Sequence, residues 1–186
     1  VNRDLFVSRD LSKMSIGIIG LGRIGSKVAK YARAFNMKVY FYDTNQKIKQ
    51  NNKKYIKVKS LKDIFKFSDI VSLHIPYNKK NNKIIDKNLF KIMKKNSYFI
   101  NTSRGEIINE NDLCFVLRKN LIKGAALDVF ENEQNSNAFK NKKLLKDKSI
   151  QNKLVLTSHI GGCTVDSMRK TEEIMANKLY KLYKKD

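Results

Sequence analysis

The stretch GLGRIG, residues 20–25, constrains the fold of this chain more than any other feature. It follows the apolar run SIGII and leads into SKVAKYARAF, whose apolar residues recur with helical spacing. Gly20, Gly22 and Gly25 thus form G-x-G-x-x-G between a predicted strand and a predicted helix. In such a turn the first glycine permits the bend, the second lets the backbone approach a pyrophosphate, and the third lets helix and strand pack closely. The turn therefore predicts a dinucleotide site at the start of the helix.

Apolar runs alternate with helix-period segments along almost the whole chain. This alternation predicts an α/β fold of the Rossmann type, a doubly wound parallel sheet with helices on both faces. The expected strands are 15–20, 38–43, 69–75, 97–103, 123–130 and 153–160, and helices are expected to begin near Gly22, Ser60, Asp86, Asn109 and Thr164. Four of these five starting residues have side chains that can cap a helix. The segments 45–59 and 131–153, rich in Asn and Lys, are expected to be loops at the rim of the sheet.

The second predicted strand ends in Asp43, 18 residues after Gly25. A carboxylate at this place can accept hydrogen bonds from the adenosine ribose hydroxyls and would repel a 2′-phosphate. We therefore expect NAD to be the cofactor in preference to NADP. The glycine pattern alone would also suit tight packing without a ligand, but the strand, the helix and the acidic residue together provide the context that a dinucleotide site requires.

Further along the chain, four stretches follow in order: SDIVSLHIP (68–76), NTSRGEIINENDL (101–113), KGAALDVFENE (123–133) and TSHIGGCT (157–164). Together with GIIGLGRIG and the YD pair, they closely resemble the nucleotide-binding domain of the D-isomer-specific 2-hydroxyacid dehydrogenases, a family that includes the phosphoglycerate, D-lactate and glyoxylate/hydroxypyruvate enzymes. The resemblance spans roughly residues 10–180. It implies an oxidoreductase that transfers a hydride between NAD and a D-2-hydroxyacid or 2-keto acid, of the phosphoglycerate or hydroxypyruvate/glyoxylate type.

The resemblance also implies roles for individual residues. The family's catalytic arginine falls on Arg104, its glutamate on Glu133 and its histidine, the acid/base, on His159. Asp128 in the LDVF segment would contact the nicotinamide carboxamide. The predicted cofactor-binding residues are Gly20, Gly22, Arg23, Ile24, Gly25, Asp43, His74, Pro76, Thr102 and Asp128, and no metal ligand is expected.

The chemistry of a 2-keto acid supports the roles of Arg104 and His159 independently. Reduction needs a cation for the carboxylate and an acid that protonates the oxygen as negative charge develops on it. Arg104 can bind a carboxylate through two hydrogen bonds, and a histidine suits proton transfer near neutral pH. Each of these side chains could instead be an ordinary surface or strand-end residue. Of the two histidines in the chain, we take His159 as the acid/base and His74 as cofactor-proximal or structural.

Two positions depart from the family pattern. The proline that usually follows the catalytic glutamate is Gln134 here, and the proline that usually precedes the histidine is Ser158. Each change removes a fixed φ angle and is expected to loosen a loop. Glu131, two residues from Glu133, is therefore an alternative partner for the histidine.

Members of the family carry a second lobe, mostly from sequence ahead of the dinucleotide domain, which closes over the substrate. Only 14 residues precede the first predicted strand here, and the chain begins with Val1 rather than Met. We expect residues 1–186 to be the NAD-binding domain of such an enzyme, with the substrate-binding lobe absent from this chain. The fragment should then bind cofactor but turn over substrate poorly. The family also implies a homodimer.

The formal net charge of +22 invites a nucleic-acid interpretation. However, 32 of the 39 basic residues are lysines and only 7 are arginines, which groove-reading proteins favour. We expect a solvated basic surface and no specific nucleic acid. The chain lacks a long apolar run and a signal peptide, which predicts a cytoplasmic protein without membrane contact. Cys114 and Cys163 lie outside any C-x-x-C spacing, so neither a disulfide nor a zinc site is expected.

Three functions therefore remain open: the dehydrogenase, an NAD-binding regulatory or scaffold module of the same fold without significant turnover, and a basic Rossmann protein associated with nucleic acid. The sequence alone does not identify the 2-hydroxyacid.

Overall fold

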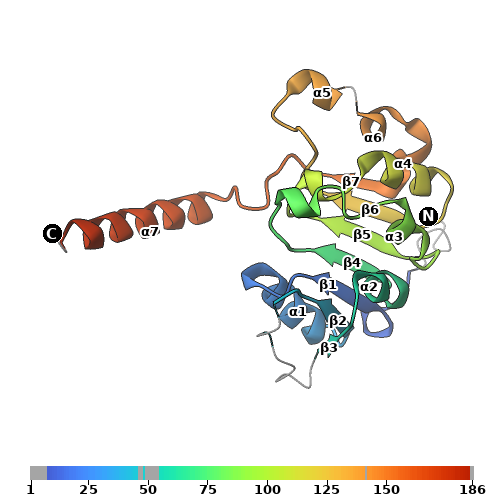
Figure 1. Ribbon diagram of the computed structural model, residues 1–186, viewed down its shortest axis with the longest axis horizontal. Coiled ribbons are helices and arrows are strands. Elements are labelled where there is room, and N and C mark those ends of the chain that lie inside the picture. Colours follow the sequence, from blue (N-terminus) through green and yellow to red (C-terminus); the bar gives the residue numbers. More distant parts are fainter. Residues whose placement is uncertain (1–7, 46–47, 49–54, 141, 185–186) are drawn as a thin grey trace, which may run out of the picture.

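The computed structural model describes residues 8–45, 48, 55–140 and 142–184. Within them, seven parallel strands form one sheet in the order β3-β2-β1-β4-β5-β6-β7 (Figure 1). The strands are β1 (Ser15–Ile19), β2 (Lys38–Tyr42), β3 (Ile56–Lys57), β4 (Ile70–Leu73), β5 (Tyr98–Asn101), β6 (Gly124–Leu127) and β7 (Leu154–Leu156). The chain builds outward from β1 to β3, crosses back, and builds from β4 to β7 on the other side. This topology confirms the predicted α/β fold of the Rossmann type.

The five predicted helices begin where the sequence places them. They are α1 (Arg23–Ala34), α2 (Leu61–Phe67), α3 (Lys87–Lys91), α4 (Glu110–Arg118) and α7 (Val165–Tyr183). The side chains of Ser60, Asp86, Asn109 and Thr164 accept hydrogen bonds from first-turn N–H groups, and so cap α2, α3, α4 and α7. Gly22 has no side chain with which to cap α1. The first N–H groups of α1 are thus left for another acceptor.

Buried side chains form a hydrophobic cluster on each face of the sheet. On one face, Ala29 and Ala32 of α1 pack with Ile16, Ile18 and Phe41. On the other, the rings of Phe65, Phe90 and Phe99 are fully buried, with centroids 5.1 to 6.4 Å apart. Burial of each such side chain contributes about 1.5–3 kcal/mol. The alternation along β1 explains the two clusters, because successive side chains of a strand point to opposite faces.

Two segments that the sequence predicts to be loops contain regular structure. In 45–59, β3 pairs with the edge strand β2, and Val58 is buried; residues 46–47 and 49–54 of this segment lie outside the described part. The segment 131–153 holds α5 (Ser136–Lys140), α6 (Lys143–Lys146) and the 3₁₀ helix η5 (Lys148–Lys153). Two buried residues, Leu144 and Ile150, anchor α6 and η5. Elements this short bury too few apolar residues to produce a visible period.

Among the described residues, three further 3₁₀ helices connect the main elements: η2 (Leu11–Lys13), η3 (Lys79–Asn81) and η4 (Gly105–Ile107). The helix α7 differs from the others because it extends away from the sheet (Figure 1). All its residues are exposed, including the apolar side chains of Met168, Leu179 and Leu182. Its apolar side chains therefore contribute nothing to the two core clusters.

Candidate functional site

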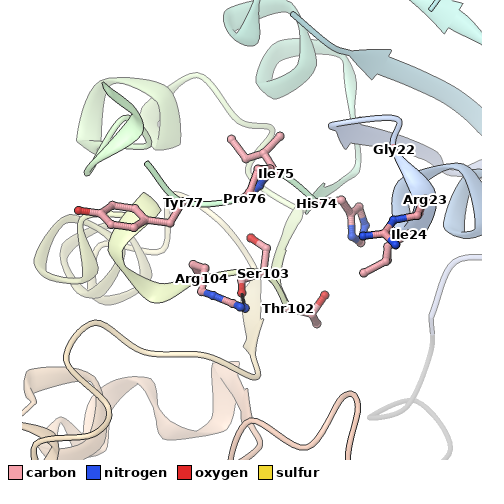
Figure 2. Close-up of a pocket in the computed structure, with 10 residues that line it drawn as sticks. All are labelled: Gly22, Arg23, Ile24, His74, Ile75, Pro76, Tyr77, Thr102, Ser103 and Arg104. Carbon is pink, nitrogen blue, oxygen red and sulfur yellow. Dashed lines mark hydrogen bonds between the residues drawn. The ribbon is translucent and has the colours of Figure 1, made fainter. Parts of the chain in front are cut away.

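The carboxyl ends of the parallel strands meet at one edge of the sheet, and the predicted site residues follow these ends. Gly20 follows β1, Asp43 follows β2, His74 follows β4, and Asp128 follows β6. The strand order reverses between β1 and β4, which is where open α/β sheets bind ligands. A cavity of about 600 Å³ lies there (Figure 2). Its lining residues are Gly22, Arg23, Ile24, His74, Ile75, Pro76, Tyr77, Thr102, Ser103 and Arg104.

The three glycines of the turn each meet a different constraint. Gly20 has a φ of +89°, and a Cβ there would lie 2.7 Å from the carbonyl oxygen of His74. A Cβ on Gly25 would lie 2.0 Å from the carbonyl oxygen of Gly20, so the helix can approach the strand only without a side chain. A Cβ on Gly22 would meet nothing within 4 Å, because Gly22 faces the cavity. The uncapped start of α1 thus faces open space, an arrangement that fits the pyrophosphate of a dinucleotide.

Asp43 is tied to this turn. Its carboxylate accepts hydrogen bonds from the N–H of Leu21 and the N–H of Asn45, each at 2.8 Å. The side chain is half-buried, and each carboxylate oxygen keeps a further lone pair. Asp43 therefore stands beside the glycine turn with capacity to accept additional hydrogen bonds.

His74 lies in the wall of the same cavity (Figure 2). Its Nε2 lies 2.9 Å from the hydroxyl of Ser72. Burial lowers the pKa of His74, because the charged imidazolium is disfavoured away from water. The ring is therefore neutral near neutral pH, as suits a residue beside a cofactor rather than a proton donor.

A second cavity, of about 480 Å³, adjoins the first and shares Tyr77 and Arg104 with it. Its remaining lining residues are Gly105, Glu106, Asn132, Glu133, Gln134, Asn135 and His159. The structure thus brings all three predicted catalytic residues to one cavity, although they come from three separate parts of the chain.

Glu133 and His159 are in direct contact. One carboxylate oxygen of Glu133 binds Nδ1 of His159, and the other accepts the N–H of Phe130 at 3.0 Å. A carboxylate acceptor requires a proton on Nδ1, which leaves Nε2 for exchange of a second proton. Glu131, the alternative partner, instead forms an ion pair with Lys83 at 2.8 Å.

Asp128 holds the loop that carries His159. Its buried carboxylate accepts the hydroxyl of Thr157 at 2.5 Å and the N–H groups of Ile160 and Gly161, each at 3.0 Å. Burial acts to raise the pKa of Asp128, but these hydrogen bonds outweigh it and hold the pKa below its usual value. His159 itself adopts a left-handed conformation with a φ of 57°. The ionised Asp128 therefore fixes the loop in which Ser158 precedes His159.

Arg104 is placed by a residue that the sequence analysis did not single out. Asn101, fully buried at the end of β5, donates from Nδ2 to the carbonyl oxygen of Arg104 at 3.0 Å. Its Oδ1 accepts the N–H of Ser103 at 3.0 Å. The guanidinium of Arg104 is exposed and donates to the carbonyl oxygen of Ser103 at 2.6 Å. A polar side chain at the end of an apolar strand was the available signal for Asn101.

In the part of the chain that the structure describes, no three His, Cys, Asp or Glu side chains gather in a way that could hold a metal ion, and none of the helices has the length and apolar composition of a membrane span. Cys114 is buried and Cys163 is exposed, and both are free thiols.

Comparison with known proteins agrees with this geometry. Residues 1–161 match the family model described as the NAD-binding domain of D-isomer specific 2-hydroxyacid dehydrogenases. A protein of Staphylococcus aureus strain MRSA252, named as a 2-hydroxyacid dehydrogenase, is 40% identical over 172 residues, which are 92% of this chain and 52% of that protein. The chain thus spans about half the length of the curated relatives it matches.

Two solved structures are similar over 97% of this chain and 56% of their own. One is the NAD complex of a D-isomer specific 2-hydroxyacid dehydrogenase from Lactobacillus delbrueckii ssp. bulgaricus, with a TM-score of 0.86 and 28% identity. The other is D-lactate dehydrogenase from Aquifex aeolicus with NAD and lactic acid, with a TM-score of 0.84 and 32% identity.

Proposed function

Because this chain belongs to the D-isomer specific 2-hydroxyacid dehydrogenases, as an NAD-binding domain of that family, we propose that the whole protein is an NAD-dependent oxidoreductase acting on a small D-2-hydroxyacid or its 2-keto acid. The observation that carries this proposal is the pair of adjoining cavities that share Arg104. In this proposal residues 1–186 supply the cofactor domain, a second lobe supplies the rest of the substrate site, and two copies form a homodimer.

The first cavity is the proposed cofactor site. NAD, when bound, supplies the hydride donor or acceptor. The uncapped start of α1 would bind the pyrophosphate, and Asp43 the adenosine ribose. The residues proposed to bind NAD are Gly20, Gly22, Arg23, Ile24, Gly25, Asp43, His74, Pro76, Thr102 and Asp128. The carboxamide contact proposed for Asp128 would use the one lone pair, on Oδ2, that its three loop hydrogen bonds leave free.

The second cavity is the proposed reaction site. Arg104 would bind the substrate carboxylate through its exposed guanidinium, whose charge persists at ordinary pH. His159 would hold the proton that the keto oxygen gains during reduction, and Glu133 would orient the imidazole through its contact with Nδ1. These roles divide the reaction between one cation and one proton donor, as the reduction of a 2-keto acid requires.

The lining of the second cavity bears on the substrate. Apart from the Tyr77 ring, Gly105 and the His159 imidazole, its lining residues are charged or carry amide side chains. This polar lining favours a small polar acid such as hydroxypyruvate or glyoxylate over a branched, apolar one. Arg104 is the one Lys or Arg among these nine residues, so a phosphorylated substrate would need further cations from the second lobe.

The test is NADH oxidation by the full-length protein with hydroxypyruvate, glyoxylate, pyruvate and 3-phosphohydroxypyruvate. We expect turnover, and we expect His159→Ala and Arg104→Ala each to reduce kcat at least about 100-fold, the usual scale for a lost acid–base group. Arg33→Ala, at the exposed far end of α1, is the control and should retain the wild-type rate.

Binding must be measured alongside turnover, because the alternative is a module that binds NAD without catalysis. If the full-length protein binds NADH but none of the four acids supports turnover, the result would favour that module. Near-normal kcat in either variant would remove the residue concerned from the mechanism.

A further inference from the structure

Glu110, in the first turn of α4, is a carboxylate buried to 8% exposure. One of its oxygens accepts the N–H of Glu131 at 2.6 Å, and the other binds Nζ of Lys142 at 2.6 Å. Both side chains of the ion pair are only 10% exposed. Taking two charges out of water is costly unless each has several partners, so this pair needs a reason to be buried beside the candidate site.

The N–H that Glu110 accepts belongs to the turn that carries Glu133. The preceding N–H, that of Phe130, is the one that donates to the Glu133 carboxylate. Two successive N–H groups of the chain therefore connect Glu110 and Glu133, one to each carboxylate. The N–H of Phe130 belongs to the peptide just before the Phe130–Glu131 peptide, and the two peptides share the Cα of Phe130. A shift of the Phe130–Glu131 peptide would therefore move the N–H group that binds the Glu133 carboxylate.

The Phe130–Glu131 peptide is also in contact with Gly105, in the loop that carries Arg104. A Cβ on Gly105 would lie 2.0 Å from the carbonyl carbon of Phe130 and 2.1 Å from the nitrogen of Glu131. Gly105, the residue after Arg104, thus packs directly against the peptide that Glu110 holds. The loops of Arg104 and Glu133 meet at a single peptide.

We propose that Glu110 and Lys142 form a positioning pair, in which Glu110 fixes the Phe130–Glu131 peptide and thereby sets the place of the Glu133 carboxylate against His159. Lys142 keeps Glu110 ionised, and therefore a strong acceptor, at a buried place. Burial raises the pKa of Glu110, and the hydrogen bonds from Lys142 and from the N–H of Glu131 oppose this rise. The catalytic consequence of this inference rests on the proposed function.

Two double variants of the full-length protein separate positioning from simple stabilisation. In Glu110→Gln with Lys142→Met, the buried charges are gone but an amide oxygen can still accept the N–H of Glu131. In Glu110→Leu with Lys142→Met, the charges are gone and so is the acceptor. Replacement of a buried ion pair by neutral or apolar side chains is often tolerated, so both variants should fold.

We expect the variant with glutamine to keep kcat within about threefold of wild type. The variant with leucine should lose roughly tenfold to a hundredfold in kcat, since displacement of a reacting group by about 1 Å has effects of this size. The NADH dissociation constant and the substrate KM should change by less than about twofold in both, because Glu110 and Lys142 line neither proposed cavity. Asp112→Asn, in the same turn of α4 but bound to the N–H of Lys87, is the control with wild-type kcat.

Equal kcat in the two double variants would overturn the proposal and leave Glu110 as a stabilising residue only. A second readout does not depend on activity: the ¹⁵N signals of the His159 imidazole, assigned by their loss in His159→Gln. The leucine variant should shift them toward the values of Glu133→Gln, and the glutamine variant should not. If the wild type proves inactive on every acid, these signals still decide the positioning, while the proposed function fails separately.

Discussion

At the scale of single residues, the site depends on contacts between residues far apart in the sequence. Glu133 and His159 are 26 residues apart yet touch, and this contact was predictable because both follow strands of one parallel sheet. The contributions of Asn101 and Glu110 were not predictable, because each depends on which backbone N–H or carbonyl group folding brings to it. Residue type and spacing can reveal a chemical group, but not its partner.

Asp43 provides a prediction at this scale. Asp43→Asn keeps one oxygen that can accept the N–H of Leu21, and its NH₂ group can donate to a ribose hydroxyl oxygen. The substitution gives up the second acceptor, which binds the N–H of Asn45, and removes the charge that would repel a 2′-phosphate. We expect wild-type protein to prefer NADH strongly, and the variant to lower the NADH-to-NADPH preference by roughly tenfold, which corresponds to about 1.4 kcal/mol. Fluorescence titration with NADH and with NADPH measures this preference, and Asp10→Asn, at the exposed cap of η2, is the control. Equal affinity of the wild type for both nucleotides would contradict the role of Asp43.

At the scale of secondary-structure elements, the six apolar strands and the capped helices could be predicted, whereas the elements within 45–59 and 131–153 could not. Four of the five predicted helices begin at side-chain caps, which act through local hydrogen bonds that residue type reveals, and α1 begins at the glycine turn. By contrast, β3 has only two residues and gains its place by pairing with β2. The elements α6 and η5 likewise depend on single buried residues, Leu144 and Ile150, packing near α4. Tertiary contacts rather than local pattern decide such elements.

The anchoring of η5 leads to a pH-dependent prediction. Asp147 caps η5 by accepting the hydroxyl and the N–H of Ser149, and it also binds Arg118 of α4. The Ser149 hydroxyl and Arg118 lower the pKa of Asp147 from 3.8 to about 2. A depressed folded-state pKa means that the carboxylate stabilises the fold fully above the unfolded pKa, and that this contribution fades as pH falls through the folded value.

We therefore expect Asp147→Ala to be less stable than wild type by an amount that is constant above about pH 4 and shrinks as the pH falls toward 2. Urea unfolding midpoints at stepped pH would measure the difference between the two proteins. Arg118→Ala should show a smaller difference with the same pH dependence, since it removes one partner and leaves the Ser149 contacts. If the difference in stability between wild type and Asp147→Ala does not vary with pH, Asp147 stabilises the fold without its charge.

At the scale of the whole molecule, the net charge of +22 is explained neither by the packing of the fold nor by the two cavities. Arg9, Arg118 and Arg169 lie in three separate parts of the structure, and each pairs with a carboxylate. Arg104 and Arg23 line the proposed cofactor cavity. Most arginines that the structure describes thus pair with carboxylates or line the proposed cofactor cavity. The lysines are therefore the main source of the positive charge on the surface. Lysines attract polyanions through charge alone, without base-specific contacts.

This distribution predicts binding to duplex DNA that is wholly electrostatic. Affinity should be measurable in low salt and should fall steeply with salt concentration, because binding by charge is driven by counterion release. Near physiological ionic strength, where the Debye length is about 8 Å, we expect no measurable binding. Fluorescence anisotropy with two unrelated duplexes over a salt series tests this, and saturating NADH should leave the curves unchanged if the cofactor cavity takes no part. Tight binding to one duplex at physiological salt would instead identify a nucleic-acid function that the cavities do not explain.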